Sequence, residues 1–155
     1  MRIGYGWDSH EFKPGVPLKI GGVSIPHAQG LAGHSDGDVL LHAITDALLG
    51  AIAEPDIGTL FSPSDPRWKA ADSLVFLQEA LKRVRAAGLA VVNVDSTLIL
   101  AAPKIAPHAA AIRESLATAM GLAPDCIGIK AKTPEGMGTD HAAIAHAVIL
   151  LEKAS

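Results

Sequence analysis

The sequence predicts an α/β or α+β fold in which helices cover one face of a sheet. Segments rich in β-branched residues, such as 89–101, alternate along the chain with segments whose apolar residues recur at helical spacing, such as 72–88. A length of 155 residues suits one compact domain, and we find no internal repeat, low-complexity segment or domain boundary. We therefore expect one domain over residues 1–155.

The first part of the chain indicates short strands. "RIGYG" at 2–6 alternates apolar and small residues, which is typical of a strand. "LKIGGVSIP" at 18–26 predicts a hairpin around the Gly21–Gly22 pair. "HAQGLAG" at 27–33 is expected to be a loop.

In the next segment the spacing of the apolar residues changes from that of a strand to that of a helix, which predicts a helix from about Asp36 to about Ala51. Ser35, with Asp38 three residues later, resembles a capping box. One helical face is apolar and carries Leu40, Ile44, Ala47 and Leu48. The opposite side carries Asp38, His42 and Asp46, spaced four apart.

A stretch at 54–73, rich in Pro, Asp, Gly and Ser, predicts a long loop. Asp72 and Gly88 mark the two ends of the clearest helix. Its apolar stripe consists of Leu74, Leu77, Leu81 and Val84.

The last part combines strands with one helix. Segment 89–101 predicts a strand, 107–121 a helix between Pro107 and Gly121, and 126–132 a strand. The tail at 142–153 is ambiguous, because its alanines favour a helix while its alternating apolar residues favour a strand.

Composition excludes several classes of protein. The formal net charge is −3 and there is no basic run, so non-specific nucleic-acid binding is set aside. Polar residues interrupt every apolar stretch before it reaches membrane-spanning length. The first ten residues match neither a signal nor a transit peptide. A single cysteine, Cys126, fits a reducing compartment, so we expect a cytoplasmic protein.

Three residues near the N-terminus form a candidate metal site. Asp8 and His10 are two apart in an extended segment, so both side chains point to one side. His42, on the polar side of its helix, is a fair third ligand. Two imidazoles and one carboxylate suit zinc and leave a fourth position for substrate or water. The short Asp-x-His pattern also occurs by chance, and a lone histidine is more often a surface or core residue.

Other residues near this trio have two interpretations each. Asp46 lies one turn beyond His42 and could orient its imidazole by accepting the other N–H, or could simply face solvent. His34 and Ser35 precede a helix, where free N–H groups suit phosphate, but Ser35 could merely cap that helix.

"KAKTPEG" at 130–136 follows a predicted strand. A hydroxyl and an ammonium group suit phosphate oxygens, and the Glu135 carboxylate suits a cation such as Mg²⁺. Taken alone, the segment more often indicates a charged turn after an edge strand.

Together these pieces resemble one family. The matching stretches are "RIGYGWDSH", "IGGVSIP", "GLAGHSDGDVLLHAITDALLG", "DIGTLFSPSDPRWKAADS", "NVDSTLILAAPKIAPH" and "IKAKTPEG". They occur in order over most of the chain, up to about Gly138, and resemble the 2-C-methyl-D-erythritol 2,4-cyclodiphosphate synthases of the non-mevalonate isoprenoid pathway.

The resemblance implies a fold with a four-stranded mixed sheet and helices on one face, assembled as a homotrimer with active sites between subunits. It implies that the tail 142–153 is a strand. It also implies a cyclising, CMP-releasing lyase that depends on one Zn²⁺ per active site, with Mg²⁺ or Mn²⁺ on the diphosphate. No nucleic acid or membrane partner is implied.

The resemblance also assigns site residues. Asp8, His10 and His42 match the zinc ligands and Glu135 the Mg²⁺ ligand, while His34 and Thr133 match donors of hydrogen bonds to developing charge. The substrate contacts match Asp8, His10, His34, Ser35, Asp56, Ile57, Gly58, Phe61, Ser62, Pro63, Ser64, Asp65, Leu100, Ala101, Ala102, Pro103, Lys104, Ile105, Ala106, Lys132, Thr133, Pro134 and Glu135. The stretch from Leu100 to Ala106 corresponds to a cytosine pocket supplied largely by the backbone of the adjacent subunit.

The sequence departs from the family pattern in two places. Position 132 is Lys where many relatives have Thr. After Gly138, "TDHAAI" replaces a "GRGEG" segment of many relatives, and Asp140 and His141 cannot replace a bidentate Arg. We therefore expect the central channel of a trimer to differ in polarity.

Two alternatives stay open at this point. A metal-holding structural module would not need His34, Ser35, Thr133 and Glu135, all of which are present. A zinc hydrolase of phosphate esters would need a general base beside the metal, and Asp46 or Asp56 could act as one.

Overall fold

The computed structural model describes residues 1–154, and its main layer is a curled five-stranded sheet. The strand order is β4-β1-β7-β5-β6. The strands are β1 (Arg2–Pro14), β4 (Gln29–Leu31), β5 (Leu89–Ile99), β6 (Ile127–Lys132) and β7 (Ala142–Lys153). Only β5 and β6 pair in parallel, whereas the other neighbours are antiparallel. The sheet is therefore mixed, as expected.

The expected strand count of four is wrong, because segment 27–33 contains strand β4 and is not wholly a loop. β4 pairs with the end of β1, from Phe12 opposite Leu31 to Pro14 opposite Gln29. A strand of three residues is too short to produce a readable alternation, so only the partner strand reveals it. Strand β1 is also longer than the expected 2–6.

Strands β2 (Leu18–Ile20) and β3 (Val23–Ile25) form the expected hairpin, as a separate two-stranded sheet. Gly21 and Gly22 between them have φ values of +60° and +78°. This left-handed conformation favours glycine, which explains the pair at the turn.

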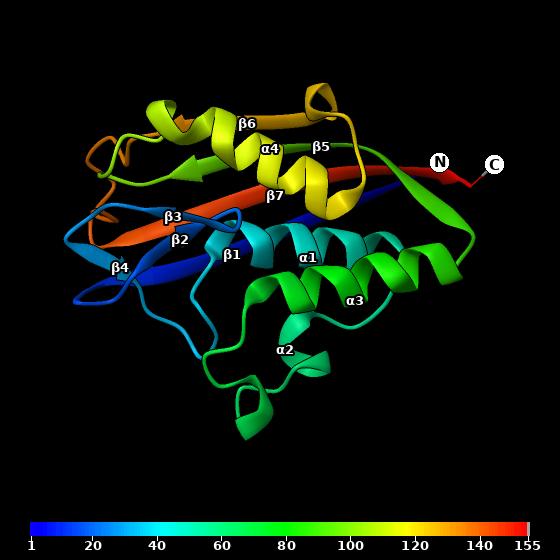
Figure 1. Cartoon of the computed structure of the whole chain (residues 1–155), viewed down its shortest axis with the longest axis horizontal. Coiled ribbons are helices and arrows are strands. Elements are labelled where there is room, and N and C mark those ends of the chain that lie inside the picture. The colour runs from blue at the N-terminus through cyan, green and yellow to red at the C-terminus, as the bar shows by residue number, and fades with distance from the viewer. Residues whose placement is uncertain (155) are drawn as a thin grey trace.

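Three long helices lie on the same side of the sheet (Figure 1). They are α1 (Val39–Ala51), α3 (Ser73–Ala86) and α4 (Ala109–Met120). Asp72 caps α3 by accepting a hydrogen bond from the backbone N–H of Leu74, and α4 ends at Gly121 with φ +68°, both as expected. Pro107 lies in a single 3₁₀ turn just before α4.

Helix α1 begins three residues later than expected. Asp38, and not Ser35, caps it, because the Asp38 side chain accepts a hydrogen bond from the Leu41 N–H at 3.0 Å. Gly37, with φ +74°, separates Ser35 from the helix. Asp38, which we expected three residues inside the helix as the last residue of a capping box, is therefore the residue that caps it.

Helix α1 is buried on nearly every side, because it lies between the sheet and α3. Ala43 and Ala47 on α1 sit directly against Gly4 and Gly6 of β1. The side of α1 that we described as polar is enclosed too: Asp38 is fully buried and His42 is 9% exposed.

The long segment at 54–73 projects below the helices in Figure 1. It is not a plain loop, because it contains the short helix α2 (Ile57–Leu60) and a 3₁₀ turn at Pro66–Trp68. Asp56 caps α2 by accepting a hydrogen bond from Thr59 N–H at 2.7 Å.

The opposite face of the sheet is open. Side chains of β1 point there alternately, so Ile3, Tyr5 and Trp7 are 72%, 58% and 48% exposed. Val148 on β7 is 44% exposed beside them. The tail forms strand β7, and its buried alternate residues, such as Ala145, face the helices.

None of the helices within residues 1–154 has the length and apolar character needed to cross a membrane.

Candidate active site

Asp8, His10 and His42 converge on one point, where β1 meets α1. The distances are 2.9 Å between Asp8 Oδ2 and His10 Nε2, 3.1 Å between Asp8 Oδ2 and His42 Nδ1, and 3.1 Å between the two ring nitrogens. Zinc bonds of about 2.0–2.1 Å place two tetrahedral ligand atoms roughly 3.3 Å apart. The three atoms therefore need to spread only slightly to hold such an ion, so the donor set fits zinc.

The far ring nitrogens of both histidines are occupied. His10 Nδ1 lies 2.7 Å from the carbonyl oxygen of Ala32, which can only accept a hydrogen bond. Neutral His10 therefore has its proton on Nδ1 and its lone pair on Nε2, toward the trio. His42 Nε2 lies 2.8 Å from Ser73 Oγ and 3.0 Å from Ser35 Oγ.

The electrostatics of the trio match a cation site. Burial alone would raise the pKa of Asp8, but hydrogen bonds and charge from His10 and His42 lower it to about 2. Burial would lower the pKa of His10, but its contact with Asp8 raises that pKa overall. The carboxylate is thus ionised and attracts positive charge, whether protons or a metal.

A cavity of about 180 Å³ opens onto these three residues. It brings together most of the residues expected around the candidate metal site: Asp8, His10, His34, Ser35, His42, Ile57, Gly58, Phe61 and Pro63. Trp68 and Phe76 also line it, although the sequence did not predict either as a site residue. Their only sequence signal was aromaticity in a chain with 4% aromatic residues.

The aromatic residues form a continuous cluster around the cavity. Phe61 lies 4.6 Å from Phe76 and 5.2 Å from Trp68, measured between ring centroids, and His42 lies 6.1 Å from Phe76. The cluster therefore connects the 61–68 segment, through Phe76, to His42 of the metal trio Asp8, His10 and His42.

Ser62, Ser64 and Asp65 of the same segment do not line the cavity. Ser62 and Ser64 contact each other through their hydroxyls at 2.8 Å, and Asp65 pairs with Arg67 at 2.6 Å. His34 Nε2 is 3.4 Å from the Asp65 carbonyl oxygen, so His34 also lies beside this segment.

Asp46 does not orient His42 in this structure. Its Oδ1 accepts a hydrogen bond from the backbone N–H of Ile57 at 2.8 Å, and so fixes the start of α2 beside the cavity. Burial raises the pKa of Asp46. The hydrogen-bond partners of the far nitrogen of His42 are Ser73 and Ser35 instead.

Two expected substrate segments lie together but away from the metal trio. Leu100 N–H donates to the carbonyl oxygen of Lys132 at 3.0 Å, which joins segment 100–106 to segment 132–135. Across the sheet, Asp8 pairs with Ala145, Ala145 with Leu98, and Leu98 with Ala131. Two strand spacings of about 4.8 Å separate Asp8 from Leu98, next to segment 100–106, and three separate it from Ala131, next to segment 132–135. These spacings correspond to roughly 10 Å and roughly 14 Å.

Within segment 132–135 the Thr133 hydroxyl donates a hydrogen bond to the Glu135 carboxylate. Both residues are exposed, and Glu135 has φ +50°. Lys132 and Pro134 complete the segment, whose side chains line none of the cavity at the metal trio.

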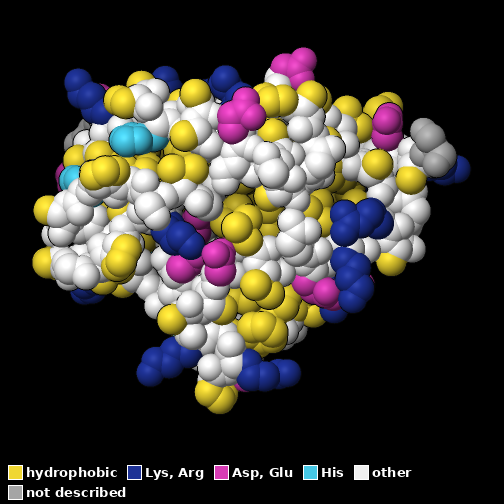
Figure 2. Space-filling model, in the orientation of Figure 1, with side chains coloured by type: hydrophobic (Ala, Val, Ile, Leu, Met, Phe, Trp, Pro, Cys, Tyr) yellow, Lys and Arg dark blue, Asp and Glu magenta, His cyan; other side chains and the backbone are white. Residues whose placement is uncertain are grey.

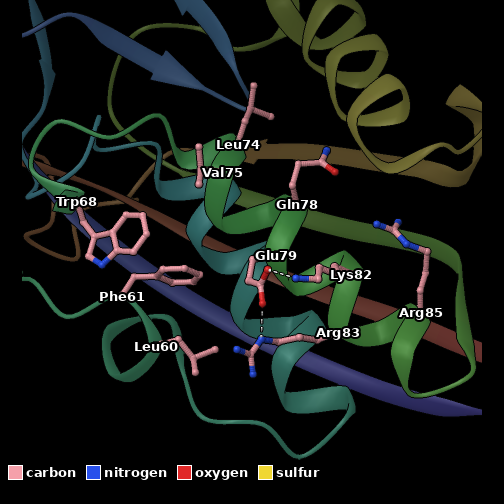
Figure 3. A pocket seen from close by; sticks show the side chains of 10 residues that line it. All are labelled: Leu60, Phe61, Trp68, Leu74, Val75, Gln78, Glu79, Lys82, Arg83 and Arg85. Carbon is pink, nitrogen blue, oxygen red and sulfur yellow. Dashed lines mark hydrogen bonds and ion pairs between the residues drawn. The ribbon is translucent and has the colours of Figure 1, made fainter.

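A second, wider groove of about 680 Å³ runs beside α3 (Figure 3). Phe61 and Trp68 border both hollows. Within residues 1–154, no cluster of three metal-ligating side chains lies in this groove. Its carboxylate, that of Glu79, is paired with Lys82 at 3.5 Å and with Arg83 at 3.0 Å. The smaller cavity is therefore the candidate active site.

Charged side chains are mixed on the helical side of the molecule. Figure 2 shows Lys and Arg side chains interspersed with Asp, Glu and apolar side chains on this face.

Comparison with known proteins gives a consistent picture. The model of the YgbB family matches residues 1–152. A protein of Koribacter versatilis (strain Ellin345), named 2-C-methyl-D-erythritol 2,4-cyclodiphosphate synthase, is 61% identical over 153 residues and covers 99% of both chains. The chloroplastic enzyme of that name from Arabidopsis thaliana is 50% identical over 99% of this chain and 68% of its own length.

Solved structures agree with the sequence relatives. A structure of a 2C-methyl-D-erythritol-2,4-cyclodiphosphate synthase superposes with a TM-score of 0.93 at 46% identity, over 97% of this chain and 100% of the other. A form of such a synthase with bound CDP superposes with a TM-score of 0.92, also at 46% identity and with the same coverage.

Proposed function

The chain belongs to the YgbB family, the family of the 2-C-methyl-D-erythritol 2,4-cyclodiphosphate synthases of isoprenoid biosynthesis, and we propose that it catalyses the ring closure that this name describes. The substrate is the 4-diphosphocytidyl ester of 2-C-methyl-D-erythritol 2-phosphate, and the products are the 2,4-cyclodiphosphate and CMP. The observation that carries the proposal is the convergence of Asp8, His10 and His42 within 3.1 Å at the base of a cavity.

We assign one Zn²⁺ per active site to this trio. Its two imidazoles and one carboxylate would hold the ion and would leave room for a phosphate oxygen. When bound, zinc supplies Lewis-acid polarisation of that oxygen, and Mg²⁺ or Mn²⁺ held by Glu135 supplies the same at the diphosphate.

The other residues of the chain position the substrate. Segments 56–58 and 61–65 hold the methylerythritol part, and segment 100–106 holds the cytosine. The 2-phosphate oxygen attacks the β-phosphorus, the bond from that phosphorus to the CMP oxygen breaks, and the electron pair leaves with CMP. His34 and Thr133 donate hydrogen bonds to the developing charge. Holding both reacting ends together can supply at most roughly 7–11 kcal/mol of the barrier.

The active form in this proposal is a homotrimer with active sites between subunits. Two observations support it. The open sheet face exposes Ile3, Tyr5, Trp7 and Val148, and apolar surface of this kind is usually covered in the assembled protein. The roughly 10 to 14 Å between the metal trio and segments 100–106 and 132–135 suits a site in which a second copy supplies those segments.

We expect Trp7→Glu to break the trimer into monomers, because a charge would then be buried in an apolar contact without a partner. Trp7 points away from α1, so the substituted chain should still fold. Light scattering after size-exclusion chromatography gives the mass. The matched control is Val75→Glu, since Val75 is 49% exposed on α3 against 48% for Trp7. A full-size trimer with Trp7→Glu would refute the use of this face.

We expect Glu135→Gln to lower the Mg²⁺-dependent turnover by about 100-fold or more while the zinc content stays stoichiometric. Lewis-acid stabilisation is worth several kcal/mol, and the amide keeps the shape of the side chain while removing its charge. Steady-state kinetics at varied Mg²⁺ and elemental analysis measure the two effects. Glu114→Gln on α4 is the control. Equal loss of both metals would mean misfolding and not loss of a Mg²⁺ ligand.

Product analysis tests the reaction itself. The protein is incubated with the cytidine diphosphate substrate, Zn²⁺ and Mg²⁺, and the products are identified by ³¹P NMR. CMP with the cyclic diphosphate supports the proposal. A linear phosphate would identify a hydrolase instead, and unchanged substrate would identify a structural module.

We also propose that the reaction takes place in the cytoplasm. The support is indirect: Cys126 is the one cysteine of the chain and it is free.

A further inference from the structure

The far side of His42 is held by a buried serine from another helix. Ser73, the first residue of α3, is fully buried, and its Oγ lies 2.8 Å from His42 Nε2. The opposite ring atom, Nδ1, is the one that faces Asp8 and His10. The Ser73 hydroxyl therefore does not itself contact the proposed metal position. It contacts the ring of His42, whose other nitrogen faces that position.

The Ser73 hydroxyl in turn contacts the Asp36 carboxylate, which receives hydrogen bonds from all sides. Ser73 Oγ and the N–H of Asp38 donate to Asp36 Oδ1, the latter at 3.2 Å. Lys19 Nζ and the Ser73 N–H each donate to Asp36 Oδ2 at 3.2 Å. An acceptor with these partners is an ionised carboxylate, so the single Ser73 hydroxyl hydrogen points to Asp36.

The direction of the hydrogen bond between Ser73 Oγ and His42 Nε2 follows from this commitment of the single Ser73 hydrogen. Because the Ser73 hydrogen is committed to Asp36, Ser73 Oγ can only accept from His42, and the proton must be on His42 Nε2. His42 Nδ1 then keeps its lone pair toward the trio. Without this constraint Asp8, whose Oδ2 lies 3.1 Å from Nδ1, would draw the proton to Nδ1 and block metal binding.

We propose that Ser73, fixed by Asp36, is a positioning residue that selects the Nε2–H tautomer of His42 and so keeps Nδ1 available to the metal. The proposal rests on the metal centre proposed above. The hydrogen-bonded partners of metal-ligating histidines act in this way generally, and their loss costs roughly 10- to 100-fold in metal affinity.

Ser35 cannot substitute fully for Ser73. Its Oγ lies 3.0 Å from His42 Nε2, so it shares the same proton in this structure. Ser35, however, is only partly buried and lines the cavity, where its hydroxyl can turn toward a ligand. Ser73 has no such freedom, because it is fully buried and Asp36 holds both its hydroxyl and its backbone N–H.

The tautomer of His42 is the first test, and it does not require zinc or turnover. Long-range ¹H–¹⁵N spectra of the metal-free protein at alkaline pH distinguish protonated from unprotonated ring nitrogens. We expect His42 of the unsubstituted chain to be wholly Nε2–H. In Ser73→Ala we expect a shift toward Nδ1–H. Ser96→Ala is the matched control, because Ser96 is also buried and donates to a backbone carbonyl, that of Gly128 at 2.8 Å.

Zinc affinity is the second test, measured by competition with a chromophoric chelator. We expect Ser73→Ala to raise the zinc dissociation constant roughly 10- to 100-fold and Ser96→Ala to leave it unchanged. If Ser73→Ala does not fold, Asp36→Asn replaces it. The amide that this substitution introduces can donate to Ser73 Oγ and so reverse the direction of the hydrogen bonds, which should weaken zinc binding as well.

An unchanged tautomer and an unchanged dissociation constant in the folded variant would overturn the proposal. Absence of zinc binding by the unsubstituted chain would reject the metal centre instead, and the tautomer measurement would still decide the role of Ser73.

Discussion

His42→Ala is expected to lose stoichiometric zinc while the chain remains folded, and ring-closing turnover should disappear with it. His42 supplies one of three ligand atoms, and Asp8 Oδ2 and His10 Nε2 alone, 2.9 Å apart, make a two-ligand site. Three protein ligands are the rule for catalytic zinc. The loss of zinc affinity should therefore exceed the roughly 10- to 100-fold loss that follows removal of a hydrogen-bond partner of a ligating histidine. Elemental analysis and circular dichroism give metal content and folding.

The control for this variant is His27→Ala. His27 is exposed and contacts the edge of Phe12 outside the cavity, so its removal should leave both zinc and turnover unchanged. A His42→Ala protein that retains one zinc per chain would remove His42 from the site and the proposed metal centre with it.

Gly6→Ala is expected to cost roughly 3 kcal/mol or more of unfolding free energy, the upper end for overpacking. A Cβ on Gly6 would lie 1.9 Å from the carbonyl oxygen of Ala43 and 2.7 Å from the backbone nitrogen of Ala47. These are backbone atoms of α1, so β1 and α1 must move apart as units. The same movement separates Asp8 from His42, so zinc affinity should fall together with stability. Urea denaturation and chelator competition measure the two quantities.

Gly50→Ala provides the matched comparison on the same helix. A Cβ there meets nothing closer than the carbonyl oxygen of Tyr5 at 3.8 Å. Alanine is the better helix former, so this variant should gain about 0.5–1 kcal/mol. Equal stabilities for the two alanine variants would mean that the approach of β1 to α1 is looser than described.

The candidate metal ligands Asp8 and His10 could be predicted from the sequence because the relevant rule is local. Asp8 and His10 have the spacing at which strand side chains share a face, and the structure brings both to one point. The helix at 72–88 was equally readable, since its cap and its apolar stripe are features of neighbouring residues. The identity of the family was readable for the same reason, because its motifs are contiguous.

The hydrogen-bond partner of His42 could not be predicted in this way. Helical spacing pointed to Asp46, four residues away, whereas the real partner is Ser73, 31 residues away on α3. That contact exists because α1 packs against α3, and helix packing depends on side chains of both helices. Strand β4 was missed because three residues are too few to show an alternation of apolar and polar side chains. The start of α1 was misplaced because Ser35 and Asp38 are both residue types that cap helices, and only the structure shows which one does so.

The sequence by itself determined the family, the residue types of the three candidate ligands and the order of the main elements, because residue identity and short spacing encode these directly. The tertiary structure alone decided which nitrogen of His42 faces Asp8 and His10, which serines contact the other nitrogen, and which sheet face stays open. These properties depend on groups that are far apart in the chain and that packing brings together. A buried polar group needs a hydrogen-bond partner, and only the packing decides which group that partner is.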